Sequence, residues 1–181
     1  MLYILYNDLK KKEVFMKKIS LLAPVILLMV IIFSFSSQPY KDQDITPWFS
    51  FLDDSKFAIQ LLSWISFQYG GSEVSIAEKG VSHFLEFFIR KGAHFTIYFL
   101  LAYFTVRAFK GLFSKRRSLI IPISYLFVVL YAISDEIHQG FTGGRTPLVS
   151  DVILDSIGCA FGVICFFLLH QKLIHFFKRV F

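Results

Sequence analysis

Two acids, a histidine and a glutamine fall within five residues, directly after a long apolar run: Asp135, Glu136, His138 and Gln139. A carboxylate beside an imidazole can carry out general acid–base chemistry, because burial raises the pKa of a carboxyl group toward neutrality. At helical spacing Asp135, His138 and Gln139 share one face. The segment is therefore the first candidate for a functional site.

A second polar group lies in the last apolar run of the chain, where Asp151 and Asp155 are one helical turn apart. Asp155 lies about 6 Å deeper than Asp151 in that run. A carboxylate at such a depth in a membrane is unfavourable unless it is paired, protonated or functional. Gly158 and Gly162 continue the same stripe, so a neighbouring helix can pack closely beneath the acids.

Three cations and a second histidine complete the set. Arg90, Lys91 and His94 lie at the beginning of another apolar run, and Arg145 follows the acidic segment after the pair Gly143–Gly144. The glycine pair predicts a turn with positive φ. Guanidinium and ammonium groups suit an anionic head group, such as a lipid phosphate or pyrophosphate.

Each of these side chains also has a purely structural explanation. Arg90 and Lys91 could snorkel at a helix end, Arg145 could pair with an acid, and His138 could bond only to the acid near it. A metal site that uses His94, His138 and the acids is a further option. No compact ligand motif such as HExxH is present, so metal and cofactor stay open.

Four apolar runs must position these residues: 19–35, 92–106, 119–133 and 152–169. The chain is 55% hydrophobic and 18% charged, with a mean hydropathy of +0.60, which excludes a soluble domain of this size. Each run is slightly shorter than the ~20 residues that span a bilayer, and flanking polar residues or local thinning absorb the difference. We therefore expect an all-α membrane protein with four transmembrane helices. A cleaved signal peptide is the alternative for the first run, which exceeds the usual ~7–15 residues of a signal core.

The basic residues predict an orientation. Thirteen of the 19 Lys and Arg residues precede the first run, separate the second from the third or follow the fourth, whereas 11 of the 13 acids fall on the opposite side. The positive-inside rule then places both termini in the cytoplasm. The net charge of +6 reflects this topology and does not indicate nucleic-acid binding. The polar residues consequently meet on the outer side.

The long outer connection is expected to contain two helices. One covers about 47–69, suits a helix in the membrane interface and ends at Gly70 and Gly71. The other covers about 75–89 and begins with a capping box at Ser75. The chain then divides into a short N-terminal tail, a membrane domain and a basic cytoplasmic tail: 1–16, 17–170 and 171–181. Met16 is an alternative start site, in which case the tail would not be translated.

Several motifs together resemble the VanZ-like family, whose founding member is linked to low-level teicoplanin resistance. The segments that carry the resemblance are Phe35–Gln38, Arg90–Phe95 with Tyr98, Ser134–Phe141, and Gly144–Arg145 followed by Asp151, Asp155 and Gly158. The resemblance covers about 17–169, and Gly143 stands where the family would have proline. It implies a multi-pass protein of a bacterial inner membrane. It carries no mechanism over to individual residues.

The first function that fits is binding or modulating an anionic envelope lipid or a lipid-linked cell-wall precursor. Low-level lipoglycopeptide resistance would be an outcome of such binding. The ligand-binding residues would be those that can contact its head group: Arg90, Lys91, His94, Gln139, Arg145 and Asp151.

The alternative is an intramembrane enzyme that acts on an outer-leaflet lipid or lipid-linked glycan. Its acid–base or metal-assisted chemistry would use Asp135, Glu136, His138 and Asp155. A third option is a proton-coupled carrier that uses Asp155 and His94. Four spans are few for a carrier, although a homo-oligomer could compensate, and the two halves show no inverted repeat.

Overall fold

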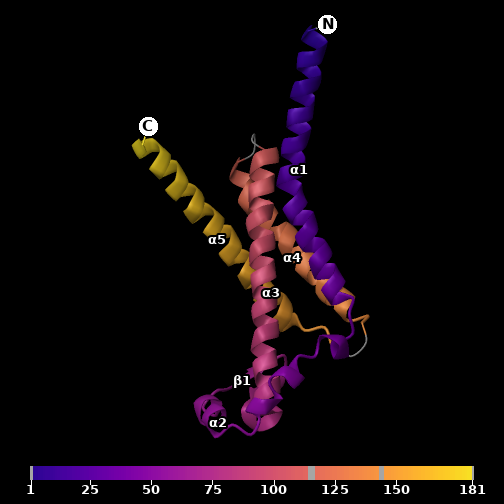
Figure 1. The fold of residues 1–181 in the computed structure, drawn as a ribbon, viewed down its shortest axis with the longest axis vertical. Helices are drawn as coiled ribbons and strands as arrows, with labels where there is room; N and C mark the ends of the chain where they lie inside the picture. The colour runs from indigo at the N-terminus through magenta and orange to yellow at the C-terminus, as the bar shows by residue number, and fades with distance from the viewer. Residues whose placement is uncertain (1, 114–116, 143–144, 181) are drawn as a thin grey trace.

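The computed structural model describes residues 2–113, 117–142 and 145–180, and most of them lie in four long helices (Figure 1). Within these ranges, the helices that are long and apolar enough to cross a membrane are α1 Leu2–Ser36, α3 Ile76–Leu112, α4 Ile120–Gln139 and α5 Val149–Val180. Three of the predicted apolar runs lie within them, and the run 119–133 begins one residue before α4. The chain is therefore a mostly helical, multi-pass membrane protein, as its hydropathy predicts.

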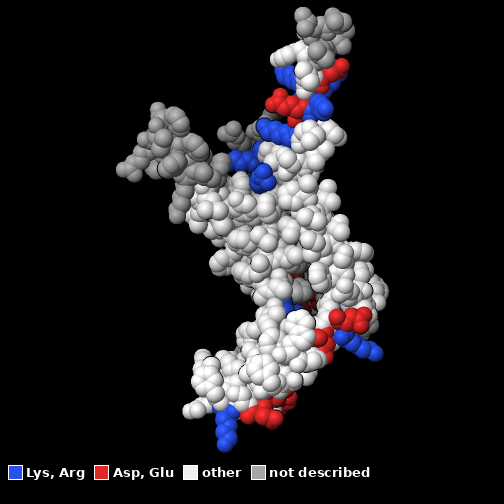
Figure 2. Space-filling model, viewed as in Figure 1, with Lys and Arg blue, Asp and Glu red and all other residues white. Residues whose placement is uncertain are grey.

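Charge is distributed along the molecule as a membrane protein requires. On the face shown in Figure 2, charged residues gather toward the two ends, and the belt between them is almost uncharged. The start of α1 and the end of α5 point toward the same end of the molecule (Figure 1). At the far edge of the belt the surface is hollowed, and charged atoms are visible inside (Figure 2).

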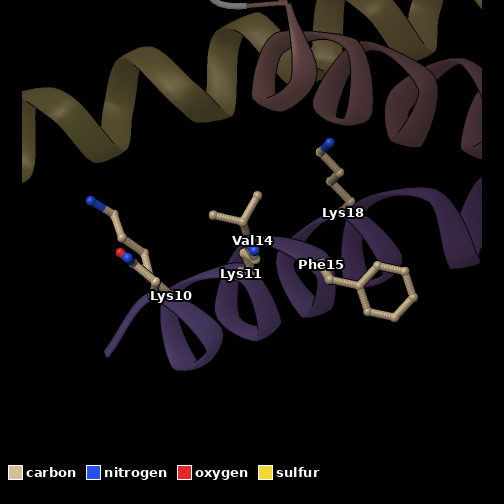
Figure 3. A pocket seen from close by; sticks show the side chains of 6 residues that line it. Lys10, Lys11, Val14, Phe15 and Lys18 are labelled. Atoms are coloured by element: carbon tan, nitrogen blue, oxygen red, sulfur yellow. The ribbon is translucent and has the colours of Figure 1, made fainter. Parts of the chain in front are cut away.

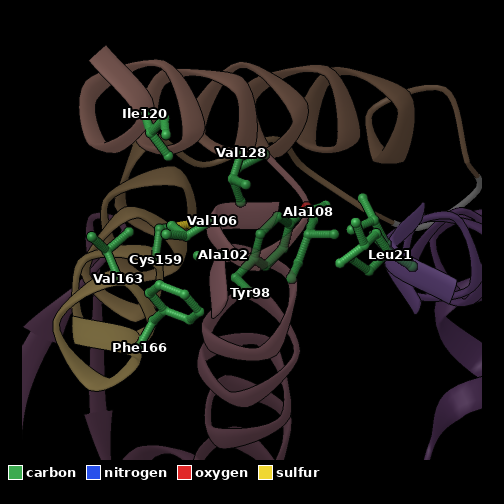
Figure 4. Close-up of a cluster of buried hydrophobic side chains, with 14 residues drawn as sticks. Leu21, Tyr98, Ala102, Val106, Ala108, Ile120, Val128, Cys159, Val163 and Phe166 are labelled. Carbon is green, nitrogen blue, oxygen red and sulfur yellow. The ribbon is translucent and has the colours of Figure 1, made fainter. Parts of the chain in front are cut away.

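Helix α3 lies at the centre of the bundle and packs against the other three long helices. Tyr98, Ala102 and Val106 of α3 meet buried side chains of α1, α4 and α5 in the apolar core (Figure 4). A Cβ added at Gly158 would lie 2.6 Å from the backbone oxygen of Phe95. The glycine stripe therefore allows α5 to approach the α3 backbone, as its spacing predicts.

The prediction of a single interfacial helix over 47–69 is wrong. The described elements between α1 and α3 are η1 Tyr40–Gln43, η2 Thr46–Trp48, η3 Ser50–Leu52, α2 Lys56–Leu62, β1 Ser66–Tyr69 and β2 Ser72–Ser75. Gly70 and Gly71 have φ values of 58° and 82°, and they form the two-residue turn of an antiparallel hairpin. Two residues with positive φ suit a tight hairpin turn, whereas a helix would need negative φ throughout.

The second predicted outer helix is real but does not end before the membrane. It continues into the second span within α3, whose 37 residues form two helical segments joined across a kink at Gly80. Ser75 caps its N-terminus as predicted, because its Oγ accepts a hydrogen bond from the Glu78 N–H at 3.3 Å. Gly80 interrupts the helix with φ 75°, and Asp53 caps the part that follows. Its carboxylate accepts the backbone N–H of Ser82 at 2.8 Å and the Ser82 hydroxyl at 2.9 Å.

The terminal segments continue the long helices. Residues 2–16 form the first turns of α1, and the backbone of 171–180 continues α5. A shallow hollow lined by lysines lies on the first part of α1 (Figure 3), with Lys10 and Lys18 on the side that faces other helices. All the lysines that line it come from one helix, as expected for cations that snorkel at a membrane boundary.

Candidate functional site

Asp135 is the point at which three helices meet through hydrogen bonds. Its carboxylate accepts the hydroxyl of Ser36 at 2.5 Å, the hydroxyl of Tyr98 at 2.9 Å and the Nε2 amide of Gln139 at 3.0 Å. Asp135 is only 5% exposed. A buried carboxylate needs such donors, and here they come from α1, α3 and α4. Asp135 thus ties together the helix ends at which the polar residues gather.

A cavity of about 370 Å³ lies between α1 and α3 beside this hub. Of the predicted site residues, it is lined by Arg90, His94, Asp135 and Arg145. Apolar side chains of both helices also line it: Ile32, Phe35, Ile89, Ala93 and Ile97. We call this space the α1–α3 cavity. Its lining combines charge and hydrogen-bond donors with hydrocarbon surface, as an amphiphilic ligand requires.

Arg145 lines this cavity, and two of its guanidinium nitrogens are held by glutamine side chains. Its Nη1 donates to the Oε1 atom of Gln139 at 3.1 Å, and its Nη2 donates to Gln43. Its Nε is buried and has no hydrogen-bond partner among the described residues. Burial lowers the pKa of Arg145, and the nearby charge of Arg90 lowers it further. An anion in the cavity would offset both effects.

Arg90 reaches the same cavity from α3 but already has an acidic partner. Its Nη2 donates to the Glu86 carboxylate one turn earlier. Its guanidinium lies 4.1 Å from the centre of the Tyr40 ring, a cation–π contact. The Tyr40 hydroxyl lies 3.3 Å from each carboxylate oxygen of Glu86. Burial raises the pKa of Tyr40, so it stays a neutral donor.

Lys91 points away from the α1–α3 cavity. Its Nζ lies 2.5 Å from the Asp151 carboxylate at the start of α5. Tyr69 of the β-hairpin also donates to Asp151, at 2.6 Å, and burial raises the pKa of its hydroxyl. Adjacent helix positions differ by about 100° around the axis, so Arg90 and Lys91 face different sides. The structure therefore does not bring Lys91 and Asp151 together with Arg145.

His94 and Asp155 face each other behind the cavity. The His94 Nδ1 lies 3.6 Å from the Asp155 Oδ1, and neither atom has a hydrogen-bond partner among the described residues. Asp155 is 1% exposed, whereas His94 also lines the cavity. Asp155 is thus placed to orient an imidazole whose other edge is open to a ligand.

Glu136 fastens the loop between α4 and α5. Its Oε1 accepts the Leu148 backbone N–H at 2.6 Å, and its buried Oε2 has no partner within the described ranges. The predicted glycine turn at 143–144 lies outside those ranges.

Asp135, His138 and Gln139 all face the end of α1, as their spacing predicts, but His138 forms no hydrogen bond with Asp135. Its ring stacks on Phe33 with centroids 4.7 Å apart, and its Nε2 lies 3.1 Å from the Ser37 hydroxyl. The positions i+3 and i+4 lie on opposite sides of i, about 100° apart around the helix. Gln139 accordingly bonds Asp135, while His138 packs on α1.

Sequence reasoning missed Asp42, Gln43 and Glu86, which line the cavity, and Tyr40, which contacts Glu86 and Arg90. The i, i+4 spacing of Glu86 and Arg90 was an available signal. No local pattern marks Tyr40 or Gln43, which reach the site through the chain path after α1. Among the residues that the structure describes, no three His, Cys, Asp or Glu side chains are arranged to hold a metal ion.

The fold and the polar cluster define a class: a multi-pass helical membrane protein with a buried charged site at one end of its apolar belt. A model of the VanZ/LLP1 family matches residues 21–170, and the chain belongs to this family. The predicted resemblance is thereby confirmed. The VanZ family is linked to teicoplanin resistance. Comparisons with curated proteins and with solved structures gave no match.

Proposed function

We propose that this protein binds an anionic amphiphile of the cell envelope, a membrane lipid or a lipid-linked cell-wall precursor, in the α1–α3 cavity. One observation carries the proposal. A single cavity combines the half-buried guanidinium of Arg145, whose Nε has no hydrogen-bond partner among the described residues, with apolar side chains of two membrane helices.

The proposed orientation would put this site in the outer leaflet. Most Lys and Arg residues lie at the helix ends opposite the site, and the positive-inside rule assigns those ends to the cytoplasm of a bacterial inner membrane. Both termini are then cytoplasmic. A ligand would reach the cavity from the leaflet in which cell-wall precursors are exposed to lipoglycopeptides, and its binding would alter their access.

The chemistry of the ligand follows from the lining. A phosphate oxygen would accept from the guanidinium of Arg145, and Arg90 would contribute a second guanidinium, since both residues line the cavity. The hydrocarbon chain would lie along the apolar side chains of α1 and α3. Asp135 would not contact the chain, because its three donors already hold it.

A binding assay with the purified full-length protein in nanodiscs tests the proposal. Polyprenyl phosphate and the neutral polyprenol of the same length are the probes. Wild type should bind the phosphate more tightly than the alcohol. Arg145→Ala should weaken phosphate binding about tenfold or more, since a hydrogen bond to a charged group contributes about 1.5–3 kcal/mol. Lys56→Ala, at an exposed cation outside the cavity, is the matched control. Equal binding of phosphate and alcohol would reject the proposal.

The His94–Asp155 pair favours one second candidate, an enzyme that acts on the bound lipid. Here His94 would act as acid or base toward a ligand in the cavity, and Asp155 would orient it. Asp155→Asn separates the two functions. A binder should retain lipid affinity in this variant and leave the lipid unchanged. An enzyme should convert the lipid in its wild-type form and lose conversion, with binding retained, in the variant.

A further inference from the structure

A second and larger cavity lies beyond Arg90, toward the start of α3. Its volume is about 680 Å³, within the range of cavities that hold drug-sized ligands. The β-hairpin contributes Tyr69 and Ser72, the first turns of α3 contribute Lys79 and His83, and the segment before α5 contributes Thr146. We call it the hairpin cavity. It is nearly twice the size of the α1–α3 cavity.

The two cavities adjoin at a pair of shared residues. Glu86 and Arg90 line both of them, and Tyr40 stacks on Arg90 at this boundary. Glu86 is 2% exposed and the Arg90 side chain is 20% exposed, so the ion pair is partly buried and borders both cavities. A ligand phosphate at Arg90 would therefore have a hydrocarbon surface on one side and the hairpin cavity on the other.

The lining of the hairpin cavity does not resemble a site for phosphate alone. Lys79, His83 and Glu78 offer hydrogen-bond donors and acceptors, and Tyr69 and Phe87 offer aromatic surface. Tyr69 and Phe87 pack edge to face at 5.2 Å, which gives the cavity a rigid wall. Such a mixture suits a bulky polar group rich in hydroxyl and amide groups.

We propose that the hairpin cavity holds the sugar of a lipid-linked glycan, whose phosphate lies at Arg90 and Arg145 and whose chain lies in the α1–α3 cavity. This inference rests on the proposed function, and it narrows the ligand class. A simple anionic phospholipid would fill only the α1–α3 cavity. A glycan-bearing lipid fills both.

The test compares two probes on the full-length protein in nanodiscs: polyprenyl diphosphate, and polyprenyl diphosphate that carries one N-acetylhexosamine. The sugar replaces an ionisable phosphate oxygen by an ester, so electrostatic attraction to the arginines would by itself weaken binding. Wild type should nevertheless bind the sugar-bearing lipid about tenfold more tightly, as expected for two or more additional hydrogen bonds.

Two variants confined to the hairpin cavity make the test specific. Ser72→Trp fills the cavity from β2, and Lys79→Ala with His83→Ala removes two exposed side chains that can donate hydrogen bonds. All three residues are exposed, so the fold should be retained. Both variants should abolish the preference for the sugar-bearing lipid and leave binding of polyprenyl diphosphate unchanged. Lys56→Ala should change neither.

The outcomes separate this inference from the proposed function. Equal affinities of wild type for the two lipids, or a preference that survives Ser72→Trp, would overturn the hairpin cavity as a glycan site and leave lipid binding intact. Failure of wild type to bind either lipid would overturn both. Loss of binding to both lipids in Ser72→Trp, with an unchanged melting temperature, would show that the hairpin cavity does not act separately and would also reject the inference.

Discussion

The hydroxyl of Tyr98 donates to the Oδ2 atom of Asp135 over 2.9 Å, and this bond joins the middle of α3 to the C-terminal end of α4. Tyr98 is fully buried, so water cannot replace its hydroxyl. The other donors to Asp135 come from α1 and α4 itself. The bond therefore helps to set the position of α3 against the walls of the α1–α3 cavity.

Tyr98→Phe should destabilise the protein while leaving its shape unchanged. The variant removes one of three donors from a buried carboxylate, and the loss should amount to about 1.5–3 kcal/mol. Thermal unfolding in detergent measures it. Tyr125→Phe, at an exposed tyrosine on α4, is the control and should melt like wild type. Equal melting temperatures for both variants would contradict the role of Asp135 as a structural hub.

Gly158→Ala should disrupt the contact between α3 and α5. The new Cβ would lie 2.6 Å from the Phe95 carbonyl oxygen, so the helices must separate, at about 1–3 kcal/mol. Gly92→Ala on α3 is the matched control, because nothing lies within 4 Å of its added Cβ. It should be neutral or slightly stabilising. Parallel melting curves decide the matter, and equal effects of the two substitutions would reject close packing at Gly158.

The cap that Asp53 places on α3 should make stability depend on pH. Hydrogen bonds from the Ser82 backbone N–H and hydroxyl lower the pKa of Asp53 below its ordinary value of 3.8. A carboxylate whose pKa is lower in the folded than in the unfolded state stabilises the protein at any pH above the unfolded-state pKa. This contribution is lost as the pH falls through the folded-state pKa. Asp53→Ala should thus lower the melting temperature at pH 7, and the difference from wild type should shrink below about pH 4.

The neighbouring Asp54→Ala is the control for that experiment, because Asp54 is exposed and forms no described cap. A difference between Asp53→Ala and wild type that stays constant down to pH 2.5 or so would speak against a carboxylate cap.

The Lys91–Asp151 pair should stabilise the hairpin against α5. Asp151→Ala removes the partner of Lys91 and an acceptor of the Tyr69 hydroxyl. Both charged side chains are largely buried, so we expect a loss well above the ~0.2–1 kcal/mol of an exposed pair. Adding Lys91→Ala to Asp151→Ala should restore part of the lost free energy of unfolding, since no unpaired charge then stays buried. A double-mutant cycle by unfolding measures the coupling, and strictly additive effects would contradict it.

The inferred topology predicts which segments can be labelled from outside the cell. A cysteine at Ser72 in the hairpin should react with a membrane-impermeant maleimide in intact cells, and a reporter fused after Phe181 should be active only in the cytoplasm. A cysteine at Lys10 should react only after the membrane is permeabilised. An extracellular reporter after Phe181 would overturn the orientation and the outer-leaflet site together.

Local features of the sequence were sufficient to predict much of the fold. The four spans follow from hydropathy, and the cap at Ser75 follows from a pattern of a few residues. The close approach at Gly158 follows from helical spacing. Each of these features depends on the residues of one helix, or on whether that helix is compatible with water or with lipid. For that reason they can be inferred before the helices are placed.

The tertiary structure alone decided which polar residues act together. Arg90 and Lys91 are adjacent in sequence, yet one faces Arg145 and the other Asp151, because the rotation of α3 is set by its packing against the other helices. The hairpin that replaces the expected interfacial helix has a different cause. Its strands pair locally across Gly70–Gly71, and this glycine pair was an available sequence signal for a two-residue hairpin turn. The sequence by itself therefore determined a membrane protein with polar groups gathered at one end. Packing over long sequence separations determined that these groups form two adjoining cavities.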